Sequence, residues 1–508
     1  PRNNIRGYEC LASEHDWKML PLLKLFQKTD LYSKDLELPN TGDLGKIQLN
    51  SLNISLDEVR VTADYGIDRK TPTTFSNVST RYVEEYAGTQ EVPELLKMTP
   101  GVYTTKEGGG VGDSRVYIRG FAQENITVMI NGVPVNDMEN GRVYWSNWNG
   151  LGDVTSAMQV VRGLGASKLA IGSIGGTINI ITKSIDSKKG GSYLQQVSDY
   201  GQFKETISYN SGRLNRDWAV SLLYSRTDGN GYVDGTYVNA NTYFLSVTKE
   251  FNENNSLVLT AIGAPQKHGQ RDQYLTPAEV DQYGHKYNRD WGYLDGEELS
   301  GRNNYYHKPH IVLNHYYNMN ENTSLNTSVY ASYGKGGGSG PLGSYDGIYF
   351  EGANKRDIIG LIPWDKIDAG NGGVSSKSIL RNSVNNHSWY GILANLNHNI
   401  DQNWALSFGL DARTYKGEHF REVRDLMGGN DWVESFKYAV DGDAGRSQTR
   451  NVDPNSTALW FVKTPAANRI AYDNDGTNTY AGLFGQIEYN DDKISAFLSS
   501  TVSSTTYK

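Results

Sequence analysis

The sequence contains little cysteine and proline and no long apolar run. Cys10 is its single cysteine, so neither an intrachain disulfide framework nor a cysteine-based metal site can form. No run approaches the ~18 uninterrupted apolar residues of a membrane-spanning helix, which excludes a helical membrane protein. The formal net charge of -8 argues against nucleic acid as a partner, because phosphate binding needs clustered Lys and Arg.

Glycine and tyrosine, by contrast, are abundant, with 55 and 34 residues in a chain of 508. This length predicts two to four domains. Many aromatic residues and glycines, combined with only 37% hydrophobic residues, are typical of transmembrane β-barrels, whose strands alternate apolar and polar residues. A large soluble β protein fits the same composition, so composition leaves both classes open.

Period-two alternation recurs after residue 190 in segments of about ten residues. In the clearest segment, 403–413, one face carries Trp404, Leu406, Phe408 and Leu410, and the other carries Ala405, Ser407, Gly409 and Asp411. Similar rows are Trp218/Val220/Leu222/Tyr224, Tyr243/Leu245/Val247, Leu325/Val329/Tyr333 and Leu483/Ile487/Tyr489. A lipid-facing apolar row opposite a lumen-facing polar row explains them. Sandwich strands also alternate, but the number of segments, about eleven, favours a barrel.

The connections between these segments are of two kinds. Residues 264–306 and 335–385 are long and rich in Gly, Asn, Asp and Tyr, and we expect them to be extracellular loops. Short turns at 252–255 and 401–402 mark the expected periplasmic end.

The earlier part of the chain is organised around residues 158–182, MQVVRGLGASKLAIGSIGGTINIIT. A β-prone run at Met158–Val161 is followed by a turn at Arg162-Gly163 and by a second β-prone run at Gly176–Thr182. The intervening glycines permit positive φ angles and close approach of other segments. The stretch therefore predicts a tight pair of strands.

Three further blocks precede this stretch: VPELLKMTPGV at 92–102, RVYIRG at 115–120 and TVMINGVPVND at 127–137. In this order the four blocks resemble the plug domain of TonB-dependent outer-membrane transporters. Residues 91–98 are predicted to form a short helix that ends at Pro100-Gly101. The resemblance implies a mainly β fold, an antiparallel transmembrane β-barrel with an N-terminal α+β plug domain in its lumen.

The resemblance also divides the chain into four regions. Residues 1–55 resemble the tail of a carboxypeptidase-regulatory-like β-sandwich plus a linker, and 56–71 hold a TonB box and linker. Residues 72–185 are the expected plug, and 186–508 the N-terminal part of the barrel. The family's barrel has 22 strands, so we expect this one to be incomplete and the protein to continue beyond residue 508.

The TonB box is a short segment with alternating valines ahead of the plug, DEVRVTA. A flexible segment of this kind can pair with the edge of a partner's sheet, and main-chain pairing tolerates varied side chains. Contact with TonB is implied for Asp57, Glu58, Val59, Arg60, Val61, Thr62 and Ala63.

The plug loops 103–113 and 136–149 would face the substrate, by position in the family. Their aromatic and hydrogen-bonding groups suit a bulky, partly apolar ligand or chelate, although the aromatic residues could instead wedge the plug against the barrel wall. The predicted contacts are Tyr103, Lys106, Glu107, Asp137, Glu139, Arg142, Tyr144, Trp145 and Trp148.

Structural roles in the plug are predicted for a second set of arginines and glycines. The arginines are expected to pair with carboxylates inside the barrel, where a charge needs a partner. The set is Arg115, Arg119, Gly120, Gly132, Arg162, Gly163, Gly175 and Gly176.

Other chemistry finds little support. The glycine-rich run 107–120 lacks the Lys-Ser/Thr of a phosphate-binding loop and precedes a strand instead of a helix. His307, His310 and His315 could be read as metal ligands, but loop histidines are more often solvent-exposed, and we predict no metal site. No catalytic constellation is present, so we predict a protein that is not an enzyme and has no cofactor.

The resemblance implies active import across the outer membrane of a Gram-negative bacterium, with TonB and its inner-membrane energising complex as partners beside outer-membrane lipid and the nutrient. The block VVRGLGASKLAIGS resembles the siderophore and vitamin receptors of the family more than its glycan importers, which implies an iron-siderophore or ferric citrate, a ligand that itself contains iron, ahead of haem or cobalamin. Alternatives are a glycan importer working with a surface lipoprotein, a non-importing receptor or adhesin, and a soluble β-rich enzyme.

Overall fold

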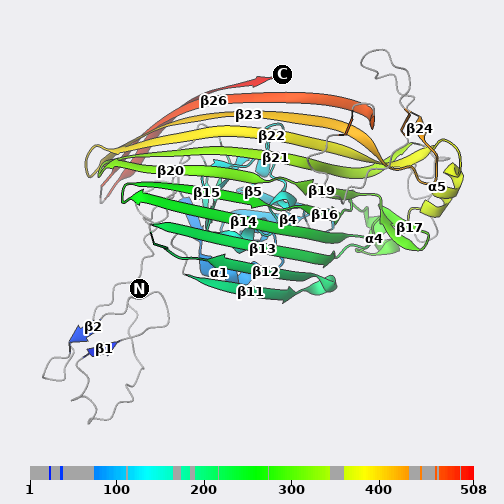
Figure 1. Cartoon of the computed structure of the whole chain (residues 1–508), viewed down its shortest axis with the longest axis horizontal. Coiled ribbons are helices and arrows are strands. Elements are labelled where there is room, and N and C mark those ends of the chain that lie inside the picture. Colours follow the sequence, from blue (N-terminus) through cyan, green and yellow to red (C-terminus); the bar gives the residue numbers. More distant parts are fainter. Residues whose placement is uncertain are drawn as a thin grey trace, which may run out of the picture. The chain divides into compact units, whose positions relative to one another are not determined.

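The computed structural model divides the chain into two compact units, Pro1–Arg60 and Val61–Lys508 (Figure 1). The described residues are 22–24, 35–37, 74–109, 112–163, 173–183, 189–215, 217–272, 274–343, 360–433, 447–448, 464–465, 468–491 and 493–508. In the first unit, strands β1 (Leu22–Lys24) and β2 (Asp35–Glu37) pair antiparallel. The predicted sandwich tail lies almost wholly outside the described residues, and the predicted TonB box lies entirely outside them.

The described helices are short, and none of them is long and apolar enough to cross a membrane. They are α1 (Thr80–Tyr86), α2 (Val92–Leu95), α3 (Leu151–Val154), α4 (Pro277–Tyr283), α5 (Trp364–Asn371) and the 3-10 helices η3 (Gln123–Asn125), η4 (Trp145–Trp148) and η5 (Asp199–Gly201). The helix predicted over 91–98 is therefore shorter than expected. The Leu96 amide bonds to the Pro93 carbonyl and the Thr99 amide to the Leu96 carbonyl, so three-residue turns replace the α-helix after Leu95.

The first part of the second unit contains two small sheets. A five-stranded sheet has the order β3-β9-β10-β7-β8, and a three-stranded sheet the order β4-β5-β6. The bounds are β3 Thr74–Val78, β4 Val102–Lys106, β5 Ser114–Ile118, β6 Phe121–Ala122, β7 Ile126–Ile130, β8 Val133–Pro134, β9 Thr155–Arg162 and β10 Gly176–Thr182. Strand β10 is buried along its whole length, antiparallel to β9 and parallel to β7. The pair of strands predicted within 158–182 is confirmed.

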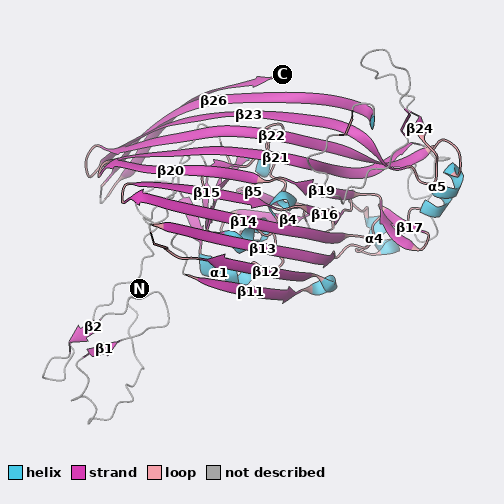
Figure 2. Ribbon diagram, in the orientation of Figure 1, coloured by secondary structure: helices cyan, strands magenta, loops and turns pink. Residues whose placement is uncertain are grey.

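After residue 189 the chain forms one curved antiparallel wall of thirteen strands (Figure 2). Eleven follow one another along its path, as the alternation predicted, and β16 and β19 lie off it. The path is β11 Gly190–Val197, β12 Phe203–Asn210, β13 Trp218–Asn230, β14 Tyr237–Asn252, β15 Asn255–Gly263, β20 His310–Asn320, β21 Thr323–Gly343, β22 Ser378–Asn399, β23 Trp404–Asp425, β26 Arg469–Asn490 and β27 Ser495–Tyr507. The off-path strands are β16 Gln266–Gly269 and β19 Asn303–His307.

The two faces of the wall differ as the sequence predicted. On β23, Trp404, Leu406, Phe408 and Leu410 are exposed, whereas Ser407 and Asp411 are buried. The apolar row points outward and the small or polar row points inward, toward the first part of the unit.

Two predicted loops, 264–306 and 335–385, are partly wrong because strands extend into both. Strand β21 continues to Gly343, β22 begins at Ser378, and β16 and β19 occupy parts of 264–306. The glycine run at 336–338 pairs with β19, and a side chain at Gly336 would meet the carbonyl of Tyr305. Glycine here permits close approach of a neighbouring strand instead of marking a loop.

The long connections gather at one end of the wall, where Figure 2 shows α4 and α5. They also contain β17 (Trp291–Leu294), β18 (Glu297–Ser300), β24 (Trp432–Val433) and β25 (Ser447–Gln448). The short turns, among them 252–255, lie at the other ends of the same strands. This asymmetry is typical of barrels with extracellular loops and periplasmic turns.

A continuous apolar core joins the first part of the unit to the wall. Leu223, Phe244 and Ile262 from β13, β14 and β15 belong to the same buried cluster as Ile178 and Ile180 of β10. A second cluster joins Met129 and Val133 to Val312, Tyr330 and Trp389 of the wall. The small sheets therefore pack against the inner face of the wall.

Replacing Gly176 with alanine is expected to destabilise β10 and its neighbours by roughly 1–3 kcal/mol. Gly176 has φ +140°, and a Cβ there would collide with the carbonyl oxygen of Val161. Hydrogen exchange of β9 and β10 amides in the purified protein should accelerate. The matched control is Gly190→Ala, where no heavy atom lies within 4 Å of an added Cβ. Equal exchange in the two variants would contradict the prediction.

Candidate functional site

The glycine-rich loop between β4 and β5 is bound directly by the wall. The main-chain amide of Arg271 donates to the carbonyl of Gly108 at 2.7 Å. The side chain of Gln270 donates to Asp113 Oδ2 at 2.7 Å, and His268 Nε2 lies 3.3 Å from the same oxygen. Three neighbouring wall residues thus hold both ends of this loop.

The glycines of this loop allow the wall to approach it closely. A Cβ at Gly112 would lie 2.6 Å from the His268 ring, and one at Gly109 would lie 2.7 Å from Thr236. Both positions have positive φ, +91° and +121°. The glycines therefore permit close contact between the loop and the wall. This agrees with the sequence argument against a phosphate-binding loop.

Two carboxylates at the base of the loop have opposite pKa shifts. Burial raises the pKa of Glu91, although its side chain accepts hydrogen bonds from the amides of Gly112 and Ser114. Burial also opposes ionisation of Asp113, but His268, the hydrogen bonds from His268 and Gln270, and the charge of Arg115 together hold its pKa below the ordinary value. The contact between loop and wall therefore favours an ionised Asp113.

The second predicted loop, 136–149, also contacts the wall. Asp137 Oδ1 accepts the amides of Glu139 and Asn140 at 2.9 and 3.3 Å, which forms a tight turn. From this turn Glu139 Oε1 lies 2.9 Å from His419 Nε2 on β23, and Asn478 of β26 donates to the carbonyl of Met138 at 2.8 Å. Asp137 and Glu139 thus shape and anchor the turn.

Trp145 and Trp148 do not face a ligand space, contrary to the prediction. They are 2% and 3% exposed and belong to the apolar core, because η4 turns both indoles inward. The Trp148 ring meets the edge of His310 on β20 at a centroid distance of 5.8 Å. The structure supports the wedge interpretation for Trp148.

The other predicted contacts do not converge on one pocket. Tyr144 is 45% exposed and accepts a hydrogen bond from Asn140 at 3.0 Å, and Arg142 pairs with Glu124 at 2.6 Å. Tyr103 is exposed beside Tyr117. Separate pairs join Lys106 to Glu94 at 3.0 Å and Glu107 to Arg115 at 3.0 Å. Tyr103 and Tyr144 are the exposed aromatic residues of the predicted set.

The predicted arginine–carboxylate pairing is correct for Arg115 and wrong for Arg162. Arg162 donates to the carbonyls of Pro100 and Phe75, at 2.5 and 3.1 Å. These main-chain oxygens belong to the turn after α2 and to β3, and they take the place of the expected carboxylate. Arg119 adopts φ +51°, and within the described residues no carboxylate pairs with it. Gly120, Gly132 and Gly163 also have positive φ, and a Cβ at Gly175 would lie 2.8 Å from that of Phe121.

A buried ion pair between plug and wall was missed by the sequence reasoning. Lys204 Nζ on β12 lies 2.8 Å from Asp153 Oδ1 of α3, and the two side chains are only 6% and 7% exposed. Lys204 also donates to the carbonyl of Gly88 at 2.8 Å. The available signal was the lysine itself, in the part of the chain after residue 190 where barrel strands were expected, since a charge inside a barrel needs a partner.

The three histidines considered as metal ligands engage different partners. His307 Nε2 lies 2.9 Å from the Tyr243 hydroxyl and His315 Nε2 3.0 Å from Asn255, while His310 packs on Trp148. Within the described part of the chain, no group of three potential ligands is close enough to hold a metal ion.

Comparison with known proteins defines the class. A family model described as the TonB-dependent receptor plug domain matches residues 68–177. The probable TonB-dependent siderophore receptor PirA of Acinetobacter baumannii is 27% identical over 188 residues, 34% of this chain and 24% of that protein. The ferric enterobactin receptor of Pseudomonas aeruginosa is 27% identical over 194 residues, 35% of this chain and 25% of that protein.

Solved structures show the same fold. The structure of the FpvAI–pyocin S2 complex aligns with a TM-score of 0.60 at 13% identity, covering 87% of this chain and 54% of that one. The unliganded ferric citrate transporter FecA aligns with a TM-score of 0.58 at 15% identity, covering 86% and 57%. The chain thus spans about a quarter of those curated relatives and just over half of those solved chains.

Residues 68–177 thus match the TonB-dependent receptor plug domain, and the chain shares the fold of these solved structures, with this domain packed on the inner face of a curved β-sheet wall. The two curated relatives are named as receptors, and the FecA structure as that of a transporter. The predicted fold class is confirmed.

Replacing Asp113 with asparagine is expected to loosen the loop between β4 and β5 at neutral pH by about 1–3 kcal/mol, since a charge-assisted contact is lost. Because the folded-state pKa of Asp113 is lowered, its contribution is present above pH ~4 and lost as pH falls through the folded pKa. Hydrogen exchange of residues 112–118 should be faster in the variant near pH 7 and equal to wild type at low pH.

The matched control is Glu107→Gln, which alters a carboxylate of the same loop whose ion pair is with Arg115 of the plug. Exchange of residues 268–271, which bind this loop, should rise in Asp113→Asn and stay unchanged in Glu107→Gln. A difference between Asp113→Asn and wild type that persists unchanged at low pH would contradict the electrostatic account.

Proposed function

We propose that this receptor imports an iron-siderophore complex or ferric citrate across the outer membrane, with energy supplied through TonB. The observation that carries the proposal is a family-matched plug seated on the inner face of a wall whose outer face is apolar. Relatives named for siderophores and a solved ferric citrate transporter support this class of ligand.

In the proposed mechanism the plug responds to a ligand that arrives from the side of the long loops. The ligand contacts exposed aromatic groups such as Tyr144, whose loop is anchored through Glu139 to His419 and through Met138 to Asn478. A shift of this loop changes the contacts that seat the plug. Residues 57–63 then become available to TonB, and the plug rearranges. No bond of the ligand is broken.

One alternative differs in substrate: a glycan importer that works with a surface lipoprotein. The other differs in mechanism: a receptor that binds its ligand without importing it. Growth of a deletion strain on a panel of ferric chelates, cobalamin and glycans separates the substrate classes. Restoration of growth on ferric chelates alone, by the complete receptor, is the expected result. Restoration on glycans alone would replace the proposal.

Tyr144 and Trp148 provide a test of which plug aromatics contact the ligand. Tyr144→Ala removes an exposed ring, and we expect ferric-chelate affinity to fall by about tenfold, the loss of about 1.4 kcal/mol of contact. Trp148→Ala removes a buried ring between plug and wall, and we expect the free energy of unfolding to fall by ~3–5 kcal/mol. Isothermal titration and thermal unfolding of the purified receptor measure the two effects. Unchanged affinity in Tyr144→Ala would remove this residue from the site.

Deletion of residues 57–63 should abolish import while leaving ligand binding at the cell surface intact, because strand addition to TonB is lost and the outer site is untouched. Uptake and surface binding of a radiolabelled ferric chelate measure the two steps. A deletion of equal length at 65–71, in the linker after the proposed box, is the control and should retain import. Import that survives deletion of 57–63 would place the TonB contact elsewhere.

A further inference from the structure

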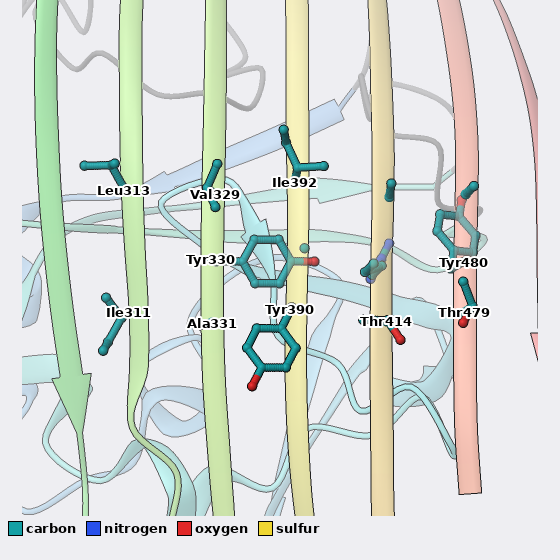
Figure 3. A pocket seen from close by; sticks show the side chains of 14 residues that line it. Ile311, Leu313, Val329, Tyr330, Ala331, Tyr390, Ile392, Thr414, Thr479 and Tyr480 are labelled. Carbon is teal, nitrogen blue, oxygen red and sulfur yellow. The ribbon is translucent and has the colours of Figure 1, made fainter.

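The outer face of the wall is hollowed across five strands, β20 to β23 and β26 (Figure 3). The hollow has a volume of about 650 Å³ and an almost wholly apolar lining. We call it the outer groove, and its lining residues are Ile311, Leu313, Val329, Tyr330, Ala331, Tyr390, Gly391, Ile392, Ala412, Arg413, Thr414, Thr479, Tyr480 and Ala481. Its outward residues lie on the side of the wall away from the plug, and the buried Tyr330 and Arg413 belong to the inward row between them.

The strand register explains the hollow. Two outward rows cross the wall at this level, Ile311-Ala331-Tyr390-Thr414-Thr479 and Leu313-Val329-Ile392-Ala412-Ala481. Both rows are bulky on β20 to β22, apart from Ala331, and then become small on β23 and β26. Between them the inward row passes through Gly391 of β22. The groove is therefore a strip of alanine and threonine beside a ridge that contains Tyr390 and Ile392.

The depth of the groove in the membrane follows from β23. Its outward residues are uncharged from Trp404 to Thr414, a span that fits the apolar band of a transmembrane barrel. The next outward residue is Lys416, which pairs with Asp475 at 2.8 Å. Ala412 and Thr414 lie directly below this first charge, in the half of the band nearer the long loops. Leu410 and Leu483 bound the groove on the periplasmic side.

We propose that the outer groove binds an acyl chain of an outer-leaflet lipid in a fixed position. The groove is continuous with the lipid-facing surface, so lipid is the material that reaches it, and its apolar lining matches a hydrocarbon chain. Thr414 and Thr479 lie at the end of the groove nearest Lys416, where their hydroxyls could bond the polar end of a lipid. The hydroxyls of Tyr333 and Tyr390 bond to each other at the same end of the ridge.

The test places the complete receptor in vesicles of phosphatidylethanolamine and phosphatidylglycerol that contain a phosphatidylethanolamine with a diazirine in its acyl chain. After irradiation, peptides containing 390–392, 412–414 and 479–481 should carry about tenfold more crosslinked lipid than those containing the outward Ile207 and Leu222 of β12 and β13. That ratio corresponds to a preference of about 1.4 kcal/mol.

Filling the groove with the double variant Ala412→Leu and Ala481→Leu should reduce crosslinking there to the level of β12 and β13. Leucine on a lipid-facing surface is compatible with folding. The matched control is Ala394→Leu, an outward alanine of β22 that pairs with Leu410 and lies outside the groove, and it should leave the pattern unchanged. Uniform labelling along the apolar band, labelling unaffected by the double variant, or protein–protein crosslinks at the groove would each overturn the proposal.

Discussion

The structure depends on one constraint: backbone polar groups that face lipid must find hydrogen-bond partners within the protein. The wall meets it through long antiparallel pairings, such as those that join β21 to β22 and β22 to β23. Once the strands are paired, alternation sends one apolar row outward and one small or polar row inward. The inward row needs partners of its own, which the plug supplies through Asp153 to Lys204 and through Asn149 to Thr242.

The loops expected to recognise a ligand are also the loops that hold the plug to the wall. One is bound by His268, Gln270 and Arg271, the other by His419 and Asn478. Because recognition and anchoring share these segments, a ligand that displaces either loop weakens the seating of the plug. This arrangement gives the proposed import mechanism a physical route from the outer surface to the plug.

The residues that the sequence placed wrongly share a cause. Trp145 and Trp148 are aromatic residues in a polar loop, a pattern typical of exposed ligand contacts, yet η4 rotates them into the core. The glycines at 336–338 are typical of a loop, yet they allow β19 to lie against β21. Arg162 is bound by two main-chain carbonyls instead of the expected carboxylate. In each case the deciding partner is distant in sequence, beyond the reach of local pattern.

By itself, the sequence determined the alternating strands along the path of the wall, though not β16 and β19, and also the outward row on β23 and the two strands of 158–182. These features follow from side-chain period and glycine spacing. Tertiary structure alone decided which plug residues are buried, which wall residues hold its loops, and where the outer face is hollow. These features depend on register between strands that lie far apart in the chain. Register sets which side chains meet, and no single strand encodes it.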